Sequence, residues 1–339
     1  MHAAGARWRP AGGRHPRRRR LGQARVILFV FVDGVGAGPR DARTNPLAAV
    51  PGILSWFRRE GEVETEGHGP LPPGTCGRLI DATLGVPGRP QSATGQAALL
   101  TGVNAPAWLG GHRLGFPGAH LCALLEEDNV LLSLAARGRR VAFLNAYPSA
   151  YLRAAGLPHD PSEHPEPALE IPRRLARKSV TTVAAEAAGL KLRTFGDLHA
   201  GRALYHDFSA LSARARRLGV PALSPEAAAD RLLAAARPYD LVLFEYFLTD
   251  KAGHARDWDL ACRIVAHLDR FLCRLIARLA PDEDALIVTS DHGNLEDLTR
   301  RTHTANPVPL VAWGRATDHL QRVHDLTGVR GLLETLCLP

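Results

Sequence analysis

Acidic and imidazole side chains follow several apolar runs of this sequence at the point where each run ends. The runs are rich in β-branched residues and are typical of buried strands. The side chains at their ends are, in chain order, Asp33, Asp250, His254, Asp291, His292 and His303, the last standing just before the run 308–313. One such pair alone could be a turn that hydrogen-bonds its own backbone. Because ligands bind at the carboxyl ends of strands in an open α/β sheet, the repeated pattern favours one shared metal site.

The spacing within the set indicates two ions rather than one. Asp250 and His254 are four residues apart, so on a helix they share a face and can hold the same ion. Asp291 and His292 are adjacent and must diverge, so they can serve a neighbouring ion. We expect two divalent ions; the imidazoles favour Mn²⁺ or Zn²⁺, with Mg²⁺ as the alternative. Two metals about 3.5–4 Å apart stabilise the attacking and leaving oxygens in phosphoryl transfer.

A second chemical feature is the hydroxyl-rich segment 90–104. A helix-capping hydroxyl is expected near Ser92, followed by a short apolar helix that ends at Thr101-Gly102. The N-terminus of a helix also stabilises anions. A hydroxyl beside a metal pair loses its proton readily and becomes a nucleophile.

The elements that must position these residues alternate between strand and helix. Strands are expected at about 25–32, 78–82 and 140–145, and helices at about 128–137 and from Ser224 onwards. This alternation predicts an α/β fold with a doubly wound, mostly parallel sheet and helices on both faces. The predicted metal-binding core comprises residues 25–147 and 222–339. The sequence 148–221 is broken by prolines, shows no convincing strand, and predicts a small, mainly helical inserted cap.

Composition excludes some classes of protein. The 339 residues are 45% hydrophobic and 22% charged, as in globular proteins. No apolar run reaches the roughly 18–20 residues that span a bilayer, so no membrane association is expected. The five cysteines show no paired metal-type spacing and are expected to be reduced, which favours a cytoplasmic protein. The chain is expected to be a monomer or a homodimer.

The net charge of +8 is concentrated at the N-terminus. Residues 1–25 contain eight arginines and no acidic residue. The alternatives are a signal peptide, a nucleic-acid-binding arm, a start codon placed too early, and a disordered basic tail; we favour the tail, residues 1–24. Without it the charge falls to about zero, so the domain is not expected to bind nucleic acid.

Several of these motifs together resemble those of the alkaline phosphatase superfamily, most closely its cofactor-independent phosphoglycerate mutase and phosphopentomutase branch. The motifs occur in the order Asp33-Gly34, Ser92 to Thr101-Gly102, Thr249-Asp250 to Gly253-His254, Asp291-His292-Gly293-Asn294, and His303-Thr304 to Pro307-Val308-Pro309. The resemblance covers about residues 25–147 and 222–339 and implies an alkaline-phosphatase-like core.

The resemblance assigns roles to individual residues. It implies one metal held by Asp33, Ser92, Asp291 and His292, and another held by Asp250, His254 and His303. Ser92 matches the family nucleophile, with Thr94 as the alternative. Asn104, His112 and Arg113 follow the nucleophile's helix and are candidates for binding substrate phosphate, or for hydrogen bonding within their loop.

The sequence also departs from the family. Gln96 stands where the phosphoglycerate mutases usually have His, and the long inserted domain of the bacterial mutases is missing. The Cys/Ser-x-Pro-x-Arg signature of sulfatases is missing too, which disfavours sulfate-ester cleavage.

We therefore expect phosphoryl transfer on a small phosphorylated metabolite through a phosphoserine. Hydrolysis by a phosphatase is slightly favoured because the predicted cap is short. The alternative is a phosphomutase, and a more distant one is a non-enzymatic nucleic-acid-associated protein.

Overall fold

The computed structural model describes residues 25–56, 72–162, 164–166 and 168–338. Its centre is a six-stranded sheet with the order β2-β8-β7-β1-β6-β3. The strands are β1 Ile27–Val32, β2 Thr75–Ile80, β3 Val141–Phe143, β6 Leu241–Tyr246, β7 Ala285–Thr289 and β8 Val308–Gly314. Only β8 runs against its neighbours β2 and β7. The predicted mostly parallel α/β sheet is therefore confirmed. The predicted tail, residues 1–24, lies outside the described residues.

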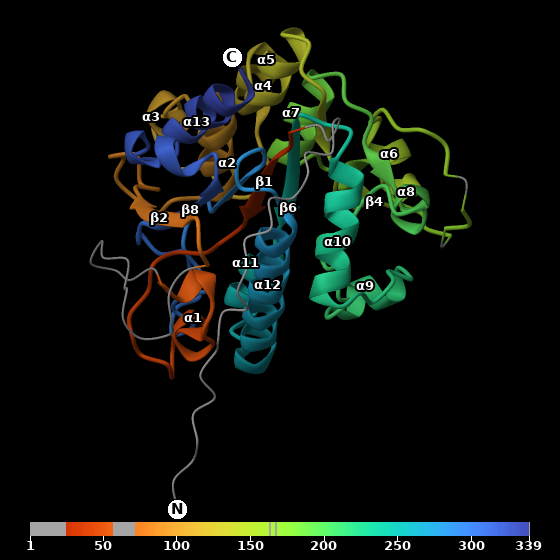
Figure 1. Cartoon of the computed structure of the whole chain (residues 1–339). Helices are drawn as coiled ribbons and strands as arrows, with labels where there is room; N and C mark the ends of the chain where they lie inside the picture. The colour runs from red at the N-terminus through yellow and green to blue at the C-terminus, as the bar shows by residue number, and fades with distance from the viewer. Residues whose placement is uncertain (1–24, 57–71, 163, 167, 339) are drawn as a thin grey trace, which may run out of the picture.

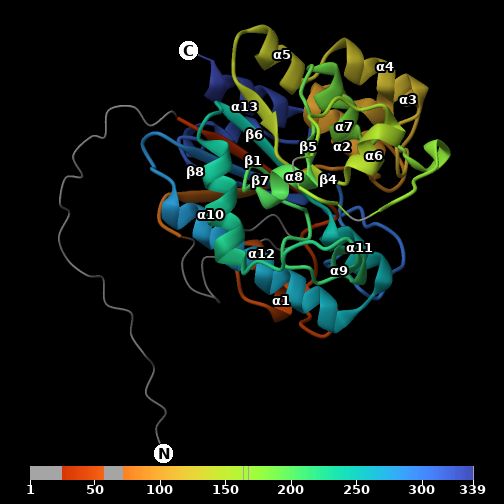
Figure 2. The same cartoon turned by 90° about the vertical axis from the view of Figure 1, so that its right-hand side faces the viewer.

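Helices cover both faces of this sheet (Figures 1 and 2). Alternate side chains of β1 enter two different cores, because successive residues of a strand point to opposite faces. Ile27, Phe29 and Phe31 pack with the helices of one face, and Leu28, Val30 and Val32 with those of the other. The first face carries α2 Ser92–Thr101, α4 Ala119–Glu127, α5 Val130–Ala136, α7 Val180–Ala187 and α13 Gly328–Cys337. The second carries α1 Pro46–Ala49, α10 Pro225–Ala236, α11 Leu248–Ala255 and α12 Trp258–Arg278.

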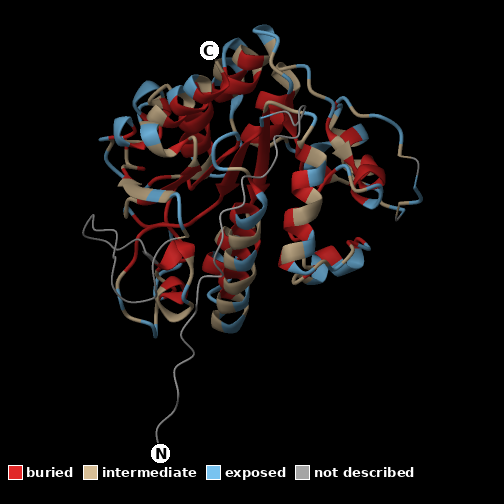
Figure 3. Ribbon diagram, in the orientation of Figure 1, coloured by how far each residue is buried: buried red, intermediate tan, exposed pale blue. Residues whose placement is uncertain are grey.

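The amphipathic pattern of the longest helix shows how these cores form. The buried residues of α12 recur every three or four positions, from Ala261 through Leu268 to Ile276. That stripe faces the sheet, and the opposite side of the helix is exposed to solvent (Figure 3). Asp257 caps the helix by accepting a hydrogen bond from the Leu260 backbone N–H.

Strand direction determines where the chemistry lies. β1 pairs in parallel register with β6 and β7, so Val32, Tyr246 and Thr289 all end at one edge of the sheet. β8 runs in the opposite direction and therefore begins at the same edge. The residues that follow three strands and precede a fourth consequently meet there.

The predicted cap, residues 148–221, contains several short elements. They are α6 Ser149–Ala155, the 3₁₀ helix η2 Arg173–Leu175, α7, β5 Arg193–Thr194, α8 Phe195–His199 and α9 Ala213–Arg217. β5 pairs with β4 Ala146–Tyr147, so the expectation of no strand in this segment was wrong. α7 packs within the first core, whereas Phe195, Leu198 and Leu218 belong to a separate small cluster. A cap with these bounds stays a prediction.

The remaining described elements are η1 Ile53–Trp56, α3 Ala105–Leu109 and η3 Thr317–Arg322. Within the described ranges, no helix is both long and apolar enough to cross a membrane.

Candidate metal centre

The first predicted ligand group meets at the carboxyl edge of β1 and β7. His292 is at its centre: Nε2 lies 3.3 Å from Asp33 Oδ1 and 3.5 Å from Asp291 Oδ2. The Ser92 hydroxyl lies 2.9 Å from the same nitrogen. Asp33, Asp291 and His292 are all buried. Their ligand atoms are close enough to one another to hold a single ion.

The second predicted group is adjacent. Asp250 and His254 share a face of α11, with His254 Nε2 3.4 Å from Asp250 Oδ2. His303 Nε2 lies 3.1 Å from His254 Nε2 and 3.5 Å from Asp250 Oδ1. The rings of His303 and His292 stack with centroids 3.7 Å apart, which joins the two groups. The structure thus brings all seven predicted ligands together.

Two glycines allow this close approach. Gly34 has a φ of +72°, and a Cβ there would lie 2.8 Å from the Asp250 Cβ. A Cβ on Gly95 would lie 2.8 Å from the Asp291 carbonyl oxygen. Side chains at these positions would separate β1 from α11, or α2 from Asp291, because real Cβ atoms do not come that close.

The donor set fits divalent cations. His303 Nδ1 lies 3.1 Å from the Pro90 carbonyl oxygen, which can only accept, so the proton sits on Nδ1 and Nε2 offers a lone pair. Asp33 Oδ1 is buried without a hydrogen-bond partner among the described residues, although His292 Nε2 is near. Lone pairs of carboxylates and neutral imidazoles that converge in this way need a cation between them.

Electrostatics support the same conclusion. Burial raises the pKa of Asp33 well above its usual value, and the charges of Asp291 and Asp250 raise it further. Burial also raises the pKa of Asp291, to about 7, and lowers that of His292 to about 3. The neutral state of His292 is the one that binds metals, and a divalent ion would return both carboxyl groups to their charged form.

Several residues outside the predicted set hold these ligands in place. Gln96 Nε2 donates to Asp291 Oδ2 at 3.1 Å, and Asn294 Nδ2 donates to Asp250 Oδ1 at 2.7 Å. Glu296, completely buried, accepts hydrogen bonds from the backbone N–H groups of Gly36 and Asn294 and from Thr304. It therefore connects the loops after β1 and β7 with the segment before β8.

Glu245 is a buried carboxyl group that the sequence analysis missed. It lies in β6 and accepts a hydrogen bond from Thr181 at 2.8 Å. Burial raises its pKa to about 7, and the charge of Asp291 contributes. The sequence feature that could have identified Glu245 is an acidic residue inside an otherwise apolar strand.

The first turn of α2 differs from the expectation. The predicted capping hydroxyl was wrong: the N-cap is Gln91, whose side chain makes no capping hydrogen bond, and Ser92 is the first helical residue. The Thr94 hydroxyl donates to the Gln91 carbonyl oxygen and accepts from the Arg113 backbone N–H, each at 3.2 Å. The Thr94 hydroxyl is thus engaged at the start of α2 and by the Arg113 backbone, whereas the Ser92 hydroxyl faces His292.

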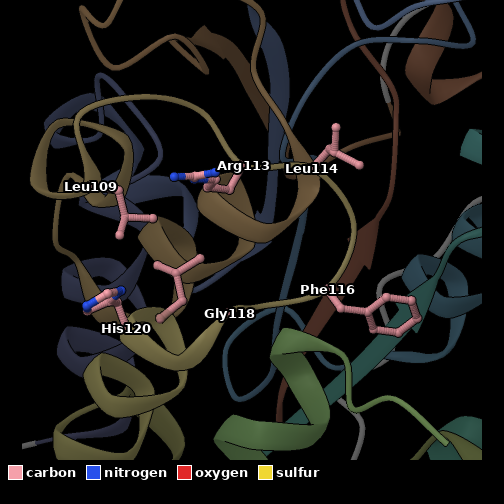
Figure 4. A pocket seen from close by; sticks show the side chains of 7 residues that line it. Leu109, Arg113, Leu114, Phe116, Gly118 and His120 are labelled. Carbon is pink, nitrogen blue, oxygen red and sulfur yellow. The ribbon is translucent and has the colours of Figure 1, made fainter. Parts of the chain in front are cut away.

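The three candidate phosphate-binding residues lie in the loops around α3. Asn104 caps α3 through Ala107 N–H and donates to the Leu84 carbonyl oxygen, so both of its polar groups serve the loop. His112 Nε2 lies 3.2 Å from the Val86 carbonyl oxygen. Arg113 lines a pocket of about 370 Å³ with Leu109 and other residues of this region (Figure 4). Their role in binding phosphate stays a prediction.

Part of the chain is similar to known metalloenzymes. Residues 220–335 match the model of the Metalloenzyme superfamily. Two curated relatives are 2,3-bisphosphoglycerate-independent phosphoglycerate mutases. The one from Halobacterium salinarum is 34% identical over 34% of this chain and 24% of its own length. The one from Dinoroseobacter shibae is 36% identical over 28% of this chain and 20% of its own length. The matched segments thus span about a quarter or less of these relatives.

Solved structures show the same fold. The alkaline phosphatase of the Antarctic bacterium TAB5 has a TM-score of 0.50 at 12% identity, covering 92% of this chain and 98% of that one. The cold-active alkaline phosphatase of Shewanella sp. has a TM-score of 0.51 at 14% identity, covering 92% of this chain and 100% of that one. The chain thus shares the fold of these alkaline phosphatases, and its residues 220–335 are similar to the Metalloenzyme superfamily.

Proposed function

We propose that the protein transfers a phosphoryl group of a small phosphomonoester through a phosphoserine at Ser92. The observation that carries the proposal is the position of the Ser92 hydroxyl, 2.9 Å from His292 Nε2 and at the first residue of α2. There the hydroxyl faces the ligand group, and the helix N-terminus favours negative charge on an incoming phosphate.

The predicted ligands would form two groups, each holding one ion. Asp33, Ser92, Asp291 and His292 would hold one divalent ion, and Asp250, His254 and His303 the other. Bound there, the ions would favour the Ser92 alkoxide and neutralise charge on the phosphoryl oxygens. As Ser92 Oγ loses its proton and bonds to phosphorus, the bond from phosphorus to the substrate's alcohol oxygen breaks, and the alcohol oxygen takes up a proton, so that no net proton is released. Gln96 and Asn294 keep Asp291 and Asp250 in position during this step.

A mutase and a phosphatase differ in what happens to the phosphoserine. The curated relatives carry the name phosphoglycerate mutase, which favours return of the phosphoryl group to another hydroxyl of the same substrate. This reverses the slight preference for hydrolysis that the short cap suggested. We therefore place intramolecular transfer first.

Hydrolysis is the second candidate because of one feature of the site. The His254 side chain is 46% exposed, so solvent reaches the second ligand group. Water at that position could attack the phosphoserine, whereas a mutase must keep water out until transfer is complete.

The remaining features of the proposal are Mn²⁺ or Zn²⁺ as the ions, a cytoplasmic location, and a monomer or homodimer as the assembly. The imidazole ligands support the choice of metal. The absence of paired cysteine spacing supports the location.

Mass spectrometry of quenched enzyme tests the nucleophile. Protein incubated with Mn²⁺ and a panel of sugar and glycerate phosphates should carry phosphate on Ser92. Ser92→Ala should lose several orders of magnitude in rate, and Thr94→Ala is the matched control because its hydroxyl is hydrogen-bonded to the Gln91 carbonyl oxygen and the Arg113 backbone N–H. Phosphate on Thr94 would refute the assignment.

Reaction in ¹⁸O-labelled water separates the two activities. A mutase should produce the positional isomer without labelled free phosphate. Labelled phosphate released at the rate of turnover would instead establish hydrolysis.

A further inference from the structure

The exposed large hydrophobic side chains of this protein gather in one region. Within the described ranges, these exposed residues are Trp108, Leu114, Phe116 and Leu175. Leu114 is 76% exposed and Leu175 is 66% exposed. Single exposed apolar residues are normal on a protein surface, whereas a contiguous group of them marks an interaction site.

Three contacts join these residues into one surface. Phe116 and His120 line the same pocket beside α3 and α4 (Figure 4). The His120 ring meets Trp108 edge-on, with centroids 6.4 Å apart. The Arg177 guanidinium group lies 4.3 Å from the centroid of the Phe116 ring, which brings the adjoining η2 to the same side. Leu175 is the last residue of η2.

The charge of this region is mainly positive. The sequences 105–125 and 171–185 contain no acidic residue. Their exposed arginines are Arg113, Arg173, Arg174 and Arg177. The acidic residues nearest to these two segments along the chain are Glu126, Glu170 and Glu186. Glu186 already pairs with Lys178 at 2.6 Å, so the arginines keep an excess of positive charge.

The composition of the region identifies its partner. We call the four exposed hydrophobic residues and the four arginines the basic apolar surface. Leu, Phe and Trp beside arginines are typical of protein segments that lie in the headgroup region of an anionic bilayer. A second copy of the chain would instead bring two sets of arginines together. Nucleic acid binds by stacking on aromatic rings, but the two most exposed side chains here are leucines, and Arg177 already covers Phe116.

We propose that the basic apolar surface binds the headgroup region of an anionic membrane. The hydrophobic side chains would enter the boundary between headgroups and acyl chains, and the arginines would pair with anionic lipids. The expectation of no membrane association came from the lack of a spanning run, whereas a surface contact needs none. The inference goes beyond the proposed function and does not depend on it.

Partition of the full-length protein onto vesicles tests the hydrophobic part of the contact. Vesicles of equal parts phosphatidylcholine and phosphatidylglycerol are sedimented with the protein, and vesicles of phosphatidylcholine alone serve for comparison. Leu114→Ser and Leu175→Ser should each lower the partition coefficient on the mixed vesicles about fivefold or more, because complete burial of a leucine side chain corresponds to about tenfold or more.

Arginine substitutions test the electrostatic part. Arg173→Gln combined with Arg174→Gln should lower partition onto the mixed vesicles roughly tenfold or more, because each cation near an anionic surface contributes roughly fivefold. Arg217→Gln combined with Arg263→Gln is the matched control, since it removes exposed arginines from α9 and α12 and should change partition less than about twofold. The basic segment 1–24 is present in every variant, so its own attraction to anionic lipid cancels in these ratios.

Tryptophan fluorescence locates the contact independently. Lipids brominated in the acyl chain near the headgroup quench tryptophans that enter this boundary. Trp108→Phe should remove part of the quenching that the wild type shows on mixed vesicles. Trp258→Phe should not, because Trp258 is a partly buried residue that packs against the second core.

The outcomes decide between the membrane and other partners. Equal partition of the wild type and of the leucine and arginine variants refutes the membrane contact. Dissociation of a soluble dimer by Leu114→Ser, with unchanged partition, would assign the surface to a second copy. Binding of polyglutamate or of a single-stranded oligonucleotide that the Arg173 and Arg174 substitutions abolish, again with unchanged partition, would assign it to an acidic polymer instead.

Discussion

At the scale of single residues, the ligand set combines buried acids with a neutral imidazole. Asp33, Asp291 and His292 lie against one another with almost no exposure to water. Burial disfavours the charged carboxylates and the charged imidazole alike, so the arrangement is stable at neutral pH when cations supply the missing positive charge.

Metal content is the first prediction at this scale. The purified protein should bind about two divalent ions per chain, and chelation should abolish activity. Asp291→Ala and His254→Ala should each lower the metal content, measured by mass spectrometry of the elements, without loss of the far-UV circular dichroism spectrum. His120→Ala, at an exposed histidine, is the control. Protein that takes up no divalent metal at micromolar concentration would disprove the metal centre.

Glu245 provides a prediction about pH. Its folded-state pKa is about 7, above the ordinary value of 4.5, so the folded protein binds this proton more tightly than the unfolded chain. The contribution of Glu245 to the stability of the metal-free protein should therefore fall as pH rises from about 4.5 to 7 and change little above that range. Glu245→Gln removes the charge and should raise the free energy of unfolding at pH 8 by roughly 3 kcal/mol.

Urea denaturation at pH 5.5 and pH 8 measures this effect. The gain from Glu245→Gln should be roughly 2 kcal/mol larger at pH 8 than at pH 5.5, because at pH 5.5 the carboxyl group of the folded protein still holds its proton. An equal gain at both values would show that the charge of Glu245 is not the cause.

At the scale of elements, one buried carboxylate joins three elements at the end of the sheet opposite the metal centre. Asp284, 1% exposed, precedes β7 and accepts hydrogen bonds from the Val26 backbone N–H before β1 and from the Ala280 N–H after α12. Arg237, after α10, donates to both carboxylate oxygens at 3.1 and 3.0 Å.

Removing that carboxylate should destabilise the fold without touching the site. Asp284→Ala leaves two backbone N–H groups and a partly buried arginine without their acceptor, which costs roughly 2–4 kcal/mol. Asp282→Ala is the control, since Asp282 is exposed and only two residues away. Urea denaturation should show the loss for Asp284→Ala alone, with unchanged metal content in both variants. A stability equal to that of the wild type would contradict this role.

At the scale of the whole molecule, the basic segment 1–24 precedes all residues of the predicted metal centre in the sequence. All seven predicted ligands belong to the sequence from Asp33 onwards. Deleting residues 1–22 should leave kcat and KM unchanged within about twofold, because every predicted ligand lies further along the chain. Steady-state kinetics of the truncated protein decides this, and a large fall in kcat would mean that these arginines take part in catalysis.

Local sequence determined much of the fold and of the ligand set. Apolar runs of strand length predict β1, β6 and β7, and Asp or His at their ends predicts the ligands, because strand ends of a parallel sheet meet at one edge. The spacing of Asp250 and His254 likewise predicts their shared helix face, which α11 shows.

The tertiary structure decided what local patterns do not encode. The Ser92 hydroxyl faces His292, 200 positions along the chain, instead of capping its own helix. Glu296 connects three separate segments, and His206 meets Phe247 across the fold. The apolar face of α7 packs into the first core. Each outcome depends on contacts between segments that lie far apart in the sequence.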